Sequence, residues 1–215
     1  MPYLLHIDSS ATPGNGSVSR RIAHSFRDAF TGPVVHRDLG LAPVPHLTAE
    51  GITARSTERA EHTPGQATAQ AVQDELIEEF LGASAYLFTV PLYNLTMPSV
   101  FKAWLDQVMV FGRTLDAGAS PPSAGRPATV ITARGGGYGP GSPNHGLDHL
   151  VPSLQDILAN PRMLGLDLRV IVPELTHAPV VPAMAELVPL HEAAMADAHR
   201  QAVQQGELLA KRLAA

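Results

Sequence analysis

Hydroxyl side chains are dense in residues 8–19, which follow the short apolar stretch 3–7. Ser10, Ser17 and Ser19 precede an amphipathic stretch, so we expect them near the N-terminal end of a helix. A helix N-terminus offers free backbone N–H groups and the positive end of the helix dipole, and neighbouring hydroxyls would complete a phosphate-binding site. The alternative is an ordinary serine-rich turn that caps a helix.

Two common phosphate-binding motifs are absent from residues 8–19, which limits the kind of phosphate that these residues could bind. It contains no Gly-Lys-Ser/Thr triplet of a P-loop, and it lacks the Gly-x-Gly-x-x-Gly spacing of dinucleotide-binding folds. A phosphate held mostly by serine and threonine, without a dedicated lysine, points to a monophosphate such as that of FMN.

A second loop, residues 91–99, has little hydrogen-bonding side-chain chemistry beyond Tyr93 and Asn94. It connects the apolar run 85–90 to a helix that we expect to begin near Pro98, a residue suited to a first helical turn. Ligands of open α/β sheets bind where strands end and helices begin. Backbone N–H groups, one amide and one aromatic ring suit the edge of a flat heterocycle.

A third loop, residues 133–141, follows the apolar stretch 128–132 and contains three consecutive glycines, Gly135 to Gly137. Glycine lets the backbone approach a ligand more closely than a residue with a Cβ atom would. The three loops follow the first, third and fourth expected strands. They would therefore lie together at the carboxyl edge of one parallel sheet.

The rest of the chain alternates strand and helix signals, as a parallel α/β sheet requires. We find no repeat and no linker long enough to divide the chain, so we expect a single domain over residues 1–215. The remaining expected elements are a strand at 34–38, an irregular connection at 39–63 of the kind often used as a lid or partner-contacting arm, helices at 66–81 and 148–164, a strand at 167–172 and an alanine-rich helix at 186–213.

Composition limits the classes of function. A formal net charge of -5 and the lack of a basic cluster argue against nucleic-acid binding. There is no apolar stretch long enough to span a membrane and no N-terminal signal pattern, so we expect a cytoplasmic protein. The chain has 0 cysteines, so redox chemistry would depend on a bound cofactor.

These loops resemble those of the FMN-dependent NADH azoreductases, within the flavodoxin-like NAD(P)H quinone reductases. The resemblance covers residues 1 to about 175 and is carried by Ser10 with Ser17-Val18-Ser19, by Pro91-Leu92-Tyr93-Asn94-Leu95 continuing through Pro98-Ser99 to Lys102, Trp104 and Asp106, and by Arg134-Gly135-Gly136 with Tyr138. It implies a flavodoxin-like α/β fold, with a five-stranded parallel sheet and helices on both faces.

The resemblance also implies roles for these residues. Ser10, Ser17, Val18 and Ser19 would hold the FMN phosphate. The isoalloxazine ring would lie against Pro91, Leu92, Tyr93, Asn94 and Leu95, and its pyrimidine side would contact Ala133, Arg134, Gly135 and Gly136. No metal is implied, and His145 with His149, four residues apart, is a weak candidate for one because no cysteine or carboxylate pattern accompanies the pair.

In such an enzyme NADH or NADPH delivers hydride to flavin N5, and a quinone or azo compound is then reduced in a ping-pong reaction. Asn94 and the backbone of Gly135 and Gly136 are candidates to stabilise negative charge on the flavin, and Tyr138 or water would supply protons. The family also implies a homodimer. The helix with Phe101, Trp104, Leu105 and Val108 has more apolar side chains than one sheet face is expected to cover, which points the same way.

The chain departs from the family pattern where the acceptor would bind. Leu95 and Leu115 stand where the family has phenylalanine, Ala133 replaces a serine, and residues 117–127 are rich in proline and serine instead of lysine. We therefore expect small quinones to be better acceptors than bulky azo dyes. Two alternatives stay open, namely a non-catalytic flavodoxin-type electron carrier and a flavin-dependent reductase or isomerase of a specialised metabolite.

Overall fold

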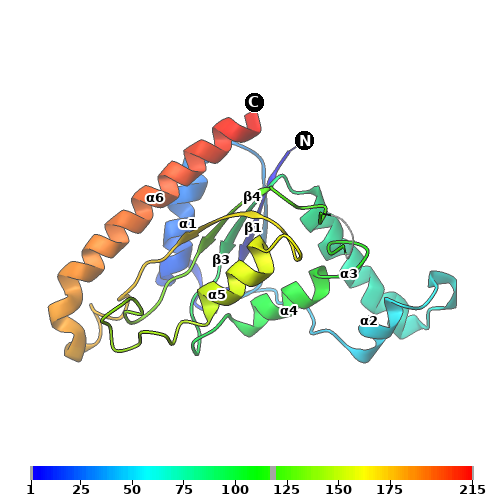
Figure 1. The fold of residues 1–215 in the computed structure, drawn as a ribbon, viewed down its shortest axis with the longest axis horizontal. Helices are drawn as coiled ribbons and strands as arrows, with labels where there is room; N and C mark the ends of the chain where they lie inside the picture. The colour runs from blue at the N-terminus through cyan, green and yellow to red at the C-terminus, as the bar shows by residue number, and fades with distance from the viewer. Residues whose placement is uncertain (1, 117–119, 215) are drawn as a thin grey trace.

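Five parallel strands form one sheet in the order β2-β1-β3-β4-β5 (Figure 1). The computed structural model describes residues 2–116 and 120–214. The strands are β1 (Leu4–Asp8), β2 (Val34–Asp38), β3 (Ala85–Thr89), β4 (Pro127–Ile131) and β5 (Asp167–Ile171). This order places β1 beside β3, so the chain crosses over between the two halves of the sheet. The predicted α/β fold with a parallel sheet is confirmed.

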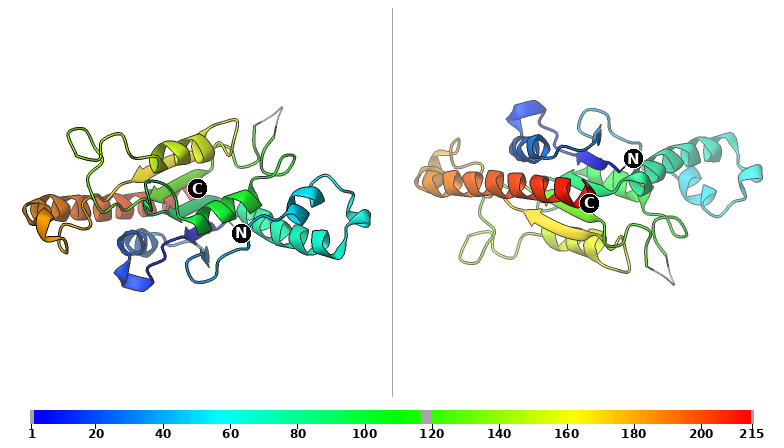
Figure 2. Two further views of the ribbon diagram at one scale, coloured as in Figure 1. Left: turned by 90° about the horizontal axis from the view of Figure 1, so that it is seen from below. Right: turned by 90° about the horizontal axis from the view of Figure 1, so that it is seen from above.

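Helices cover both faces of the sheet (Figures 1 and 2). On one face α1 (Val18–Ala29) packs against the long α6 (Val188–Ala214). The other face carries α3 (Pro64–Gly82), α4 (Ser99–Val108) and α5 (Leu150–Leu154), the last continued by a π-helical turn, Gln155–Ala159.

The central position of β3 in the sheet explains why its sequence is apolar up to Thr89. Tyr86 and Phe88 point into the core beneath α3 and α4, whereas Leu87 points into the core beneath α1 and α6. Successive side chains on a strand face opposite ways, so a strand covered on both faces loses the usual alternation with polar residues.

The apolar face of α4 is covered within the chain itself. Phe101, Trp104, Leu105 and Val108 are all buried, and the rings of Phe101 and Trp104 pack on Phe88. The apolar content of α4 therefore gives no support to a dimer. The dimer prediction then rests on the family resemblance and on the long connection 39–63.

Two predicted segments differ from the structure. The connection 39–63 is not irregular throughout, because it contains α2 (Ala49–Ala54) and a 3-10 turn, Arg59–Glu61. Thr48 caps α2 by accepting a hydrogen bond from the Gly51 N–H, and α2 packs on α3 at the end of the molecule farthest from the start of α6 (Figure 2). The helix expected at 148–164 ends at Ala159, since Asn160 precedes Pro161 and such a residue disfavours helix.

The other expected elements lie close to their predicted positions. The helix at 64–82 begins with a capping box formed by Thr63 and Gln66. The C-terminal helix follows a 3-10 turn, Pro182–Leu187. Part of the proline- and serine-rich segment 117–127 lies outside the described residues; in the remainder, Ser123 is buried and donates a hydrogen bond to the Leu164 carbonyl.

Candidate functional site

A cavity of about 440 Å³ opens at the carboxyl edge of the sheet, where the loops after β1, β3, β4 and β5 meet. The predicted residues that line it are Ser10, Ser17, Val18, Ser19, Pro91, Leu92, Tyr93, Ala133 and Gly135. Loops far apart in the sequence therefore come together as the parallel topology requires.

The first loop is held in place by a buried charge network beside the cavity. The Arg20 guanidinium donates to Asp8, to both carboxylate oxygens of Asp38 and to the Ser10 carbonyl, the last at 2.9 Å. Burial acts to raise the pKa of Asp8, but the contacts of its carboxylate with His36, His6 and Thr89 outweigh this effect and hold the pKa well below its usual range. Asp8 is therefore a carboxylate at neutral pH, and the network fixes the path of the loop.

Two buried hydroxyls lie at the start of α1 and face the cavity. Ser17 is the N-cap of α1, and its Oγ accepts a hydrogen bond from the Arg20 N–H at 3.4 Å. The Ser17 Oγ and the Ser19 Oγ are 3.2 Å apart, and both side chains are at least nine-tenths buried. Paired hydroxyls beside the positive end of a helix are a donor set suited to a phosphate. Thus the helix-cap and phosphate interpretations of this sequence are compatible.

The second loop is a tight reversal that Tyr93 connects to the first loop. Tyr93 and Thr96 exchange two backbone hydrogen bonds, and Asn94 and Leu95 between them have left-handed φ angles of 47° and 69°. The Tyr93 hydroxyl lies 3.1 Å from the backbone N of Ala11 and accepts its hydrogen. Leucine rarely adopts this backbone conformation, so the turn stores strain beside the cavity.

Asn94 and Leu95 do not line the cavity itself. Both are exposed at the tip of the turn, and Asn94 instead borders a neighbouring groove formed with α4. The roles expected for these two residues against a flavin ring therefore stay predictions.

The third loop uses its glycines to accommodate side chains of the protein. A Cβ atom at Gly135 would lie 2.4 Å from Cε1 and Nδ1 of His177, and one at Gly136 would lie 2.8 Å from the Asn144 amide nitrogen. The His177 imidazole thus packs directly on the backbone of Gly135 at the cavity wall. Close approach requires glycine here, as predicted, but in the described structure the approaching group is an imidazole.

Arg134, Gly136 and Tyr138 belong to the third loop but do not line the cavity. The buried Arg134 side chain donates to Asp148 at 2.7 Å, and its guanidinium lies 5.4 Å from the ring centroid of Tyr138. The Tyr138 N–H donates to Glu174. None of the three is among the residues that line the cavity, so cofactor contact by Arg134 and Gly136, and proton donation by Tyr138, stay predictions.

A fourth loop, which follows β5 and has no sequence motif, also borders the cavity. Its backbone pairs with the third loop, since the N–H groups of Thr176 and His177 donate to the carbonyls of Arg134 and Gly135. The cavity-lining residues not predicted are Thr12, Gly16, Arg21, Thr176, His177, Pro179, Val180 and His191. The signal that could have identified this loop is its position, because ligands of open α/β sheets bind at the carboxyl ends of the strands and this loop follows the carboxyl end of β5.

One expectation is corrected by the structure, and one weak candidate finds no support. Leu115 is 5% exposed and belongs to the apolar core, so its identity does not shape an acceptor site within the chain. His145 and His149 do not belong to a potential metal cluster; among the described residues the one such group is His6, Asp8 and His36. No helix within residues 2–116 and 120–214 combines the length and the apolar character needed to cross a membrane.

Comparison with known proteins agrees with this geometry. The family described as having a flavodoxin-like fold matches residues 3–202. An FMN-dependent NADH:quinone oxidoreductase of Streptomyces avermitilis is 47% identical over 220 residues, with 100% of both chains covered. One of the same name from Streptomyces coelicolor is 44% identical and covers 100% of this chain and 98% of its own.

Solved structures show the same fold. The azoreductase from Bacillus anthracis str. Sterne superposes with a TM-score of 0.80 at 22% identity, covering 96% of this chain and 99% of its own. The fold and the loops at its carboxyl edge thus define a flavodoxin-like protein. The chain belongs to the flavodoxin-like family and, within it, to the FMN-dependent NADH:quinone oxidoreductases, which confirms the resemblance seen in the sequence.

Proposed function

We propose that this protein is an FMN-dependent NADH:quinone oxidoreductase that also accepts azo compounds to a smaller extent. The observation that carries the proposal is the buried Ser17 and Ser19 pair at the start of α1, facing a cavity in a chain 47% identical to a protein of that name. NADPH stays open as an alternative electron donor. A single domain over residues 1–215 is part of the proposal.

The residues of the cavity fit an FMN molecule in its two chemical parts. The hydroxyls of Ser10, Ser17 and Ser19 supply neutral donors for a phosphate at a helix N-terminus. Leu92 and Ala133 supply apolar walls for a flat ring. A second phosphate would need further donors, so the donor set favours FMN over FAD.

When bound, FMN would supply the hydride-accepting and hydride-donating centre. The protein's part is to hold the phosphate with the Ser17 and Ser19 hydroxyls and to fix the loops that border the ring. Tyr93 performs the second task, because its hydroxyl bonds the first loop while its backbone closes the turn of the second. Asn94 and the backbone N–H groups at Gly135 and Gly136 are proposed to oppose negative charge on the reduced ring.

Proton supply to the reduced acceptor has a further candidate. Tyr138 is the side chain expected for this task, but it is not among the residues that line the cavity. His177 lines the cavity and is exposed, so its imidazole is accessible both to solvent and to a molecule bound in the cavity. We propose His177, with water, as the alternative to Tyr138.

The experiment is to release and identify the cofactor of the purified protein and then to measure steady-state NADH oxidation. We expect one FMN per chain and rapid NADH oxidation with a benzoquinone, with a bulky azo dye as the slower acceptor. Stoichiometric FAD, or an FMN-loaded protein that oxidises NADH with neither acceptor, would contradict the proposal.

Assembly and location are further parts of the proposal. We propose a homodimer, supported by the family resemblance, and a cytoplasmic location, supported by the similarity to NADH-dependent oxidoreductases. Light scattering at micromolar concentration tests the first, with twice the mass of the 22.8 kDa chain expected. A monomer with fully bound flavin would contradict it.

A further inference from the structure

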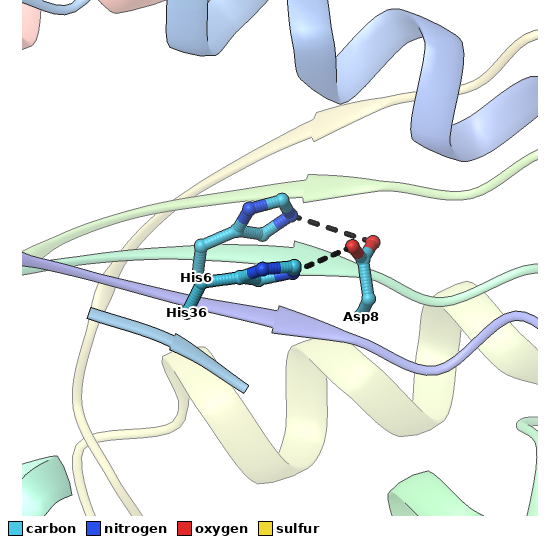
Figure 3. Close-up of side chains that lie close together, drawn as sticks. All are labelled: His6, Asp8 and His36. Carbon is cyan, nitrogen blue, oxygen red and sulfur yellow. Dashed lines mark hydrogen bonds and ion pairs between the residues drawn. The ribbon is translucent and has the colours of Figure 1, made fainter. Parts of the chain in front are cut away.

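His6, Asp8 and His36 form a compact cluster at the β1–β2 edge of the sheet (Figure 3). His6 and Asp8 are two residues apart on β1 and so face the same side, and His36 is the direct register partner of His6 on β2. The two imidazoles stack with ring centroids 4.6 Å apart, and both point toward the Asp8 carboxylate (Figure 3). The sheet thus preorganises the three side chains.

The distances in this cluster suit a metal ion. The His36 Nε2 is 2.8 Å and the His6 Nε2 is 3.4 Å from an Asp8 oxygen, and the three ligand atoms all lie within 4.8 Å of one another. In a tetrahedral zinc site with bonds of about 2.0–2.1 Å, ligand atoms are roughly 3.3 Å apart. Small shifts of these side chains would bring all three to that spacing.

A second observation concerns the His6 side chain. It is 1% exposed, and among the described residues its Nε2 has only the long 3.4 Å contact with Asp8, which is not a well-formed hydrogen bond. Buried polar atoms are nearly always satisfied, so this atom calls for a partner. The His36 side chain, by contrast, is 41% exposed, which leaves a path for an ion and room for a water ligand.

We propose that His6, Asp8 and His36 bind one divalent transition-metal ion, with water completing the coordination beside His36. Two imidazoles and a carboxylate suit Zn²⁺, and they also suit Ni²⁺, Cu²⁺ or Fe²⁺. The three residues are not among those lining the cavity described above, so the site is distinct from the proposed flavin site.

The groups around the cluster both support the site and compete with it. Thr89 donates to one Asp8 oxygen and Arg20 to the other, which fixes the carboxylate. Arg27 lies 3.1 Å from the His6 Nδ1. Because a guanidinium only donates, this contact places the proton of neutral His6 on Nε2.

Metal binding therefore requires a rearrangement at His6. The proton must move from Nε2 to Nδ1, and Arg27, which is half-buried on α1, must turn away. Its positive charge also opposes that of the ion. A glutamine at this position would remove the charge and offer an oxygen to accept the Nδ1 hydrogen, as outer-shell partners of metal-bound histidines commonly do.

The test is a zinc titration of the purified, flavin-containing protein after removal of metals, in competition with a chromophoric chelator. We expect one Zn²⁺ per chain at the cluster. His36→Gln keeps a hydrogen-bond donor to Asp8 yet removes a metal ligand. The affinity of this variant for Zn²⁺ should therefore fall by more than about 100-fold, which exceeds the usual effect of losing an outer-shell partner. The matched control, His145→Gln with His149→Gln, removes two histidines outside the cluster and should leave the affinity unchanged.

Arg27→Gln provides a gain-of-binding test and should tighten zinc binding about tenfold, the scale of an outer-shell effect. Circular dichroism would verify that each variant folds, and anomalous diffraction at the zinc edge would place the ion. Absence of binding by the unmodified chain at millimolar zinc, or equal affinity in His36→Gln, overturns the proposal. Neither result bears on quinone reduction, which is measured separately.

Discussion

Replacing Ser17 and Ser19 together by alanine removes both hydroxyls that face the cavity from the start of α1. A hydrogen bond to a charged group contributes about 1.5–3 kcal/mol, so two of them sum to roughly 3–6 kcal/mol. The two hydroxyls also contact each other, and for this reason we expect the lower end of the range. FMN affinity should fall by about 100-fold or more.

The variant also loses a helix cap, and the assay must separate that effect from cofactor binding. Ser17 accepts a hydrogen bond from the Arg20 N–H, and loss of such a cap costs about 1 kcal/mol of stability. Ser9→Ala is the matched control, because its buried hydroxyl donates to the Thr89 carbonyl at 2.7 Å and is not among the groups lining the cavity.

Titration of FMN into the apoprotein, followed by quenching of flavin fluorescence, gives the affinities, and thermal unfolding gives the stabilities. Both variants should unfold at a lower temperature, and the double variant alone should bind FMN weakly. If the double variant keeps wild-type affinity while its unfolding temperature falls, the serines are structural and the phosphate assignment is wrong.

Gly135→Ala should lower the unfolding free energy by about 1 kcal/mol, because the added Cβ would overlap the His177 ring. In a His177→Ala background the same substitution should have no such effect, and a loss of stability that persists there would point to another cause. Leu95→Asn should raise the unfolding free energy by about 1 kcal/mol in urea titrations, because asparagine tolerates the left-handed φ of 69°, and a decrease would contradict the assigned strain. Burial raises the pKa of Tyr86 to about 12, so the protonated phenol stabilises the fold below pH 10, and about 2–3 kcal/mol of the unfolding free energy is lost between pH 10 and 12. Tyr86→Phe should lack this loss in urea titrations at the two pH values. A variant with the same pH profile as the unmodified protein would refute the prediction.

The fold could be predicted from the sequence because its strands have clear signals. Residues 85–90 form an uninterrupted apolar run, which is typical of a parallel strand covered on both faces, and Tyr86, Leu87 and Phe88 point into two different cores. The short α2 was missed because six residues give too little periodicity, and its main signal is the single cap at Thr48.

The candidate site was predicted where hydroxyls or glycines mark a loop, and missed where the loop has no motif. Ser17 and Ser19 could be placed at a helix start from their types and positions alone. His177 could not, because it reaches the cavity through pairing of two loops about 40 residues apart, and no local pattern records that pairing. Leu115 was misplaced because its match to a position of the family pattern does not show whether the side chain faces the core or a site.

The buried charge network could also not be predicted from local sequence patterns. Asp8, Arg20 and Asp38 belong to three different elements, and their contact depends on the packing of α1 on the β1–β2 edge. Long-range pairs of this kind follow from topology, and the sequence alone does not fix which charges meet.

The central claim is that the bound flavin takes electrons from NADH and passes them to a quinone, and an anaerobic absorbance titration tests it most directly. The account predicts that one equivalent of NADH bleaches the flavin band of the purified protein and that a benzoquinone, added after the nicotinamide is removed, restores it. If dithionite bleaches the flavin whereas NADH does not, the protein is an electron carrier or acts on another donor, and the account is contradicted.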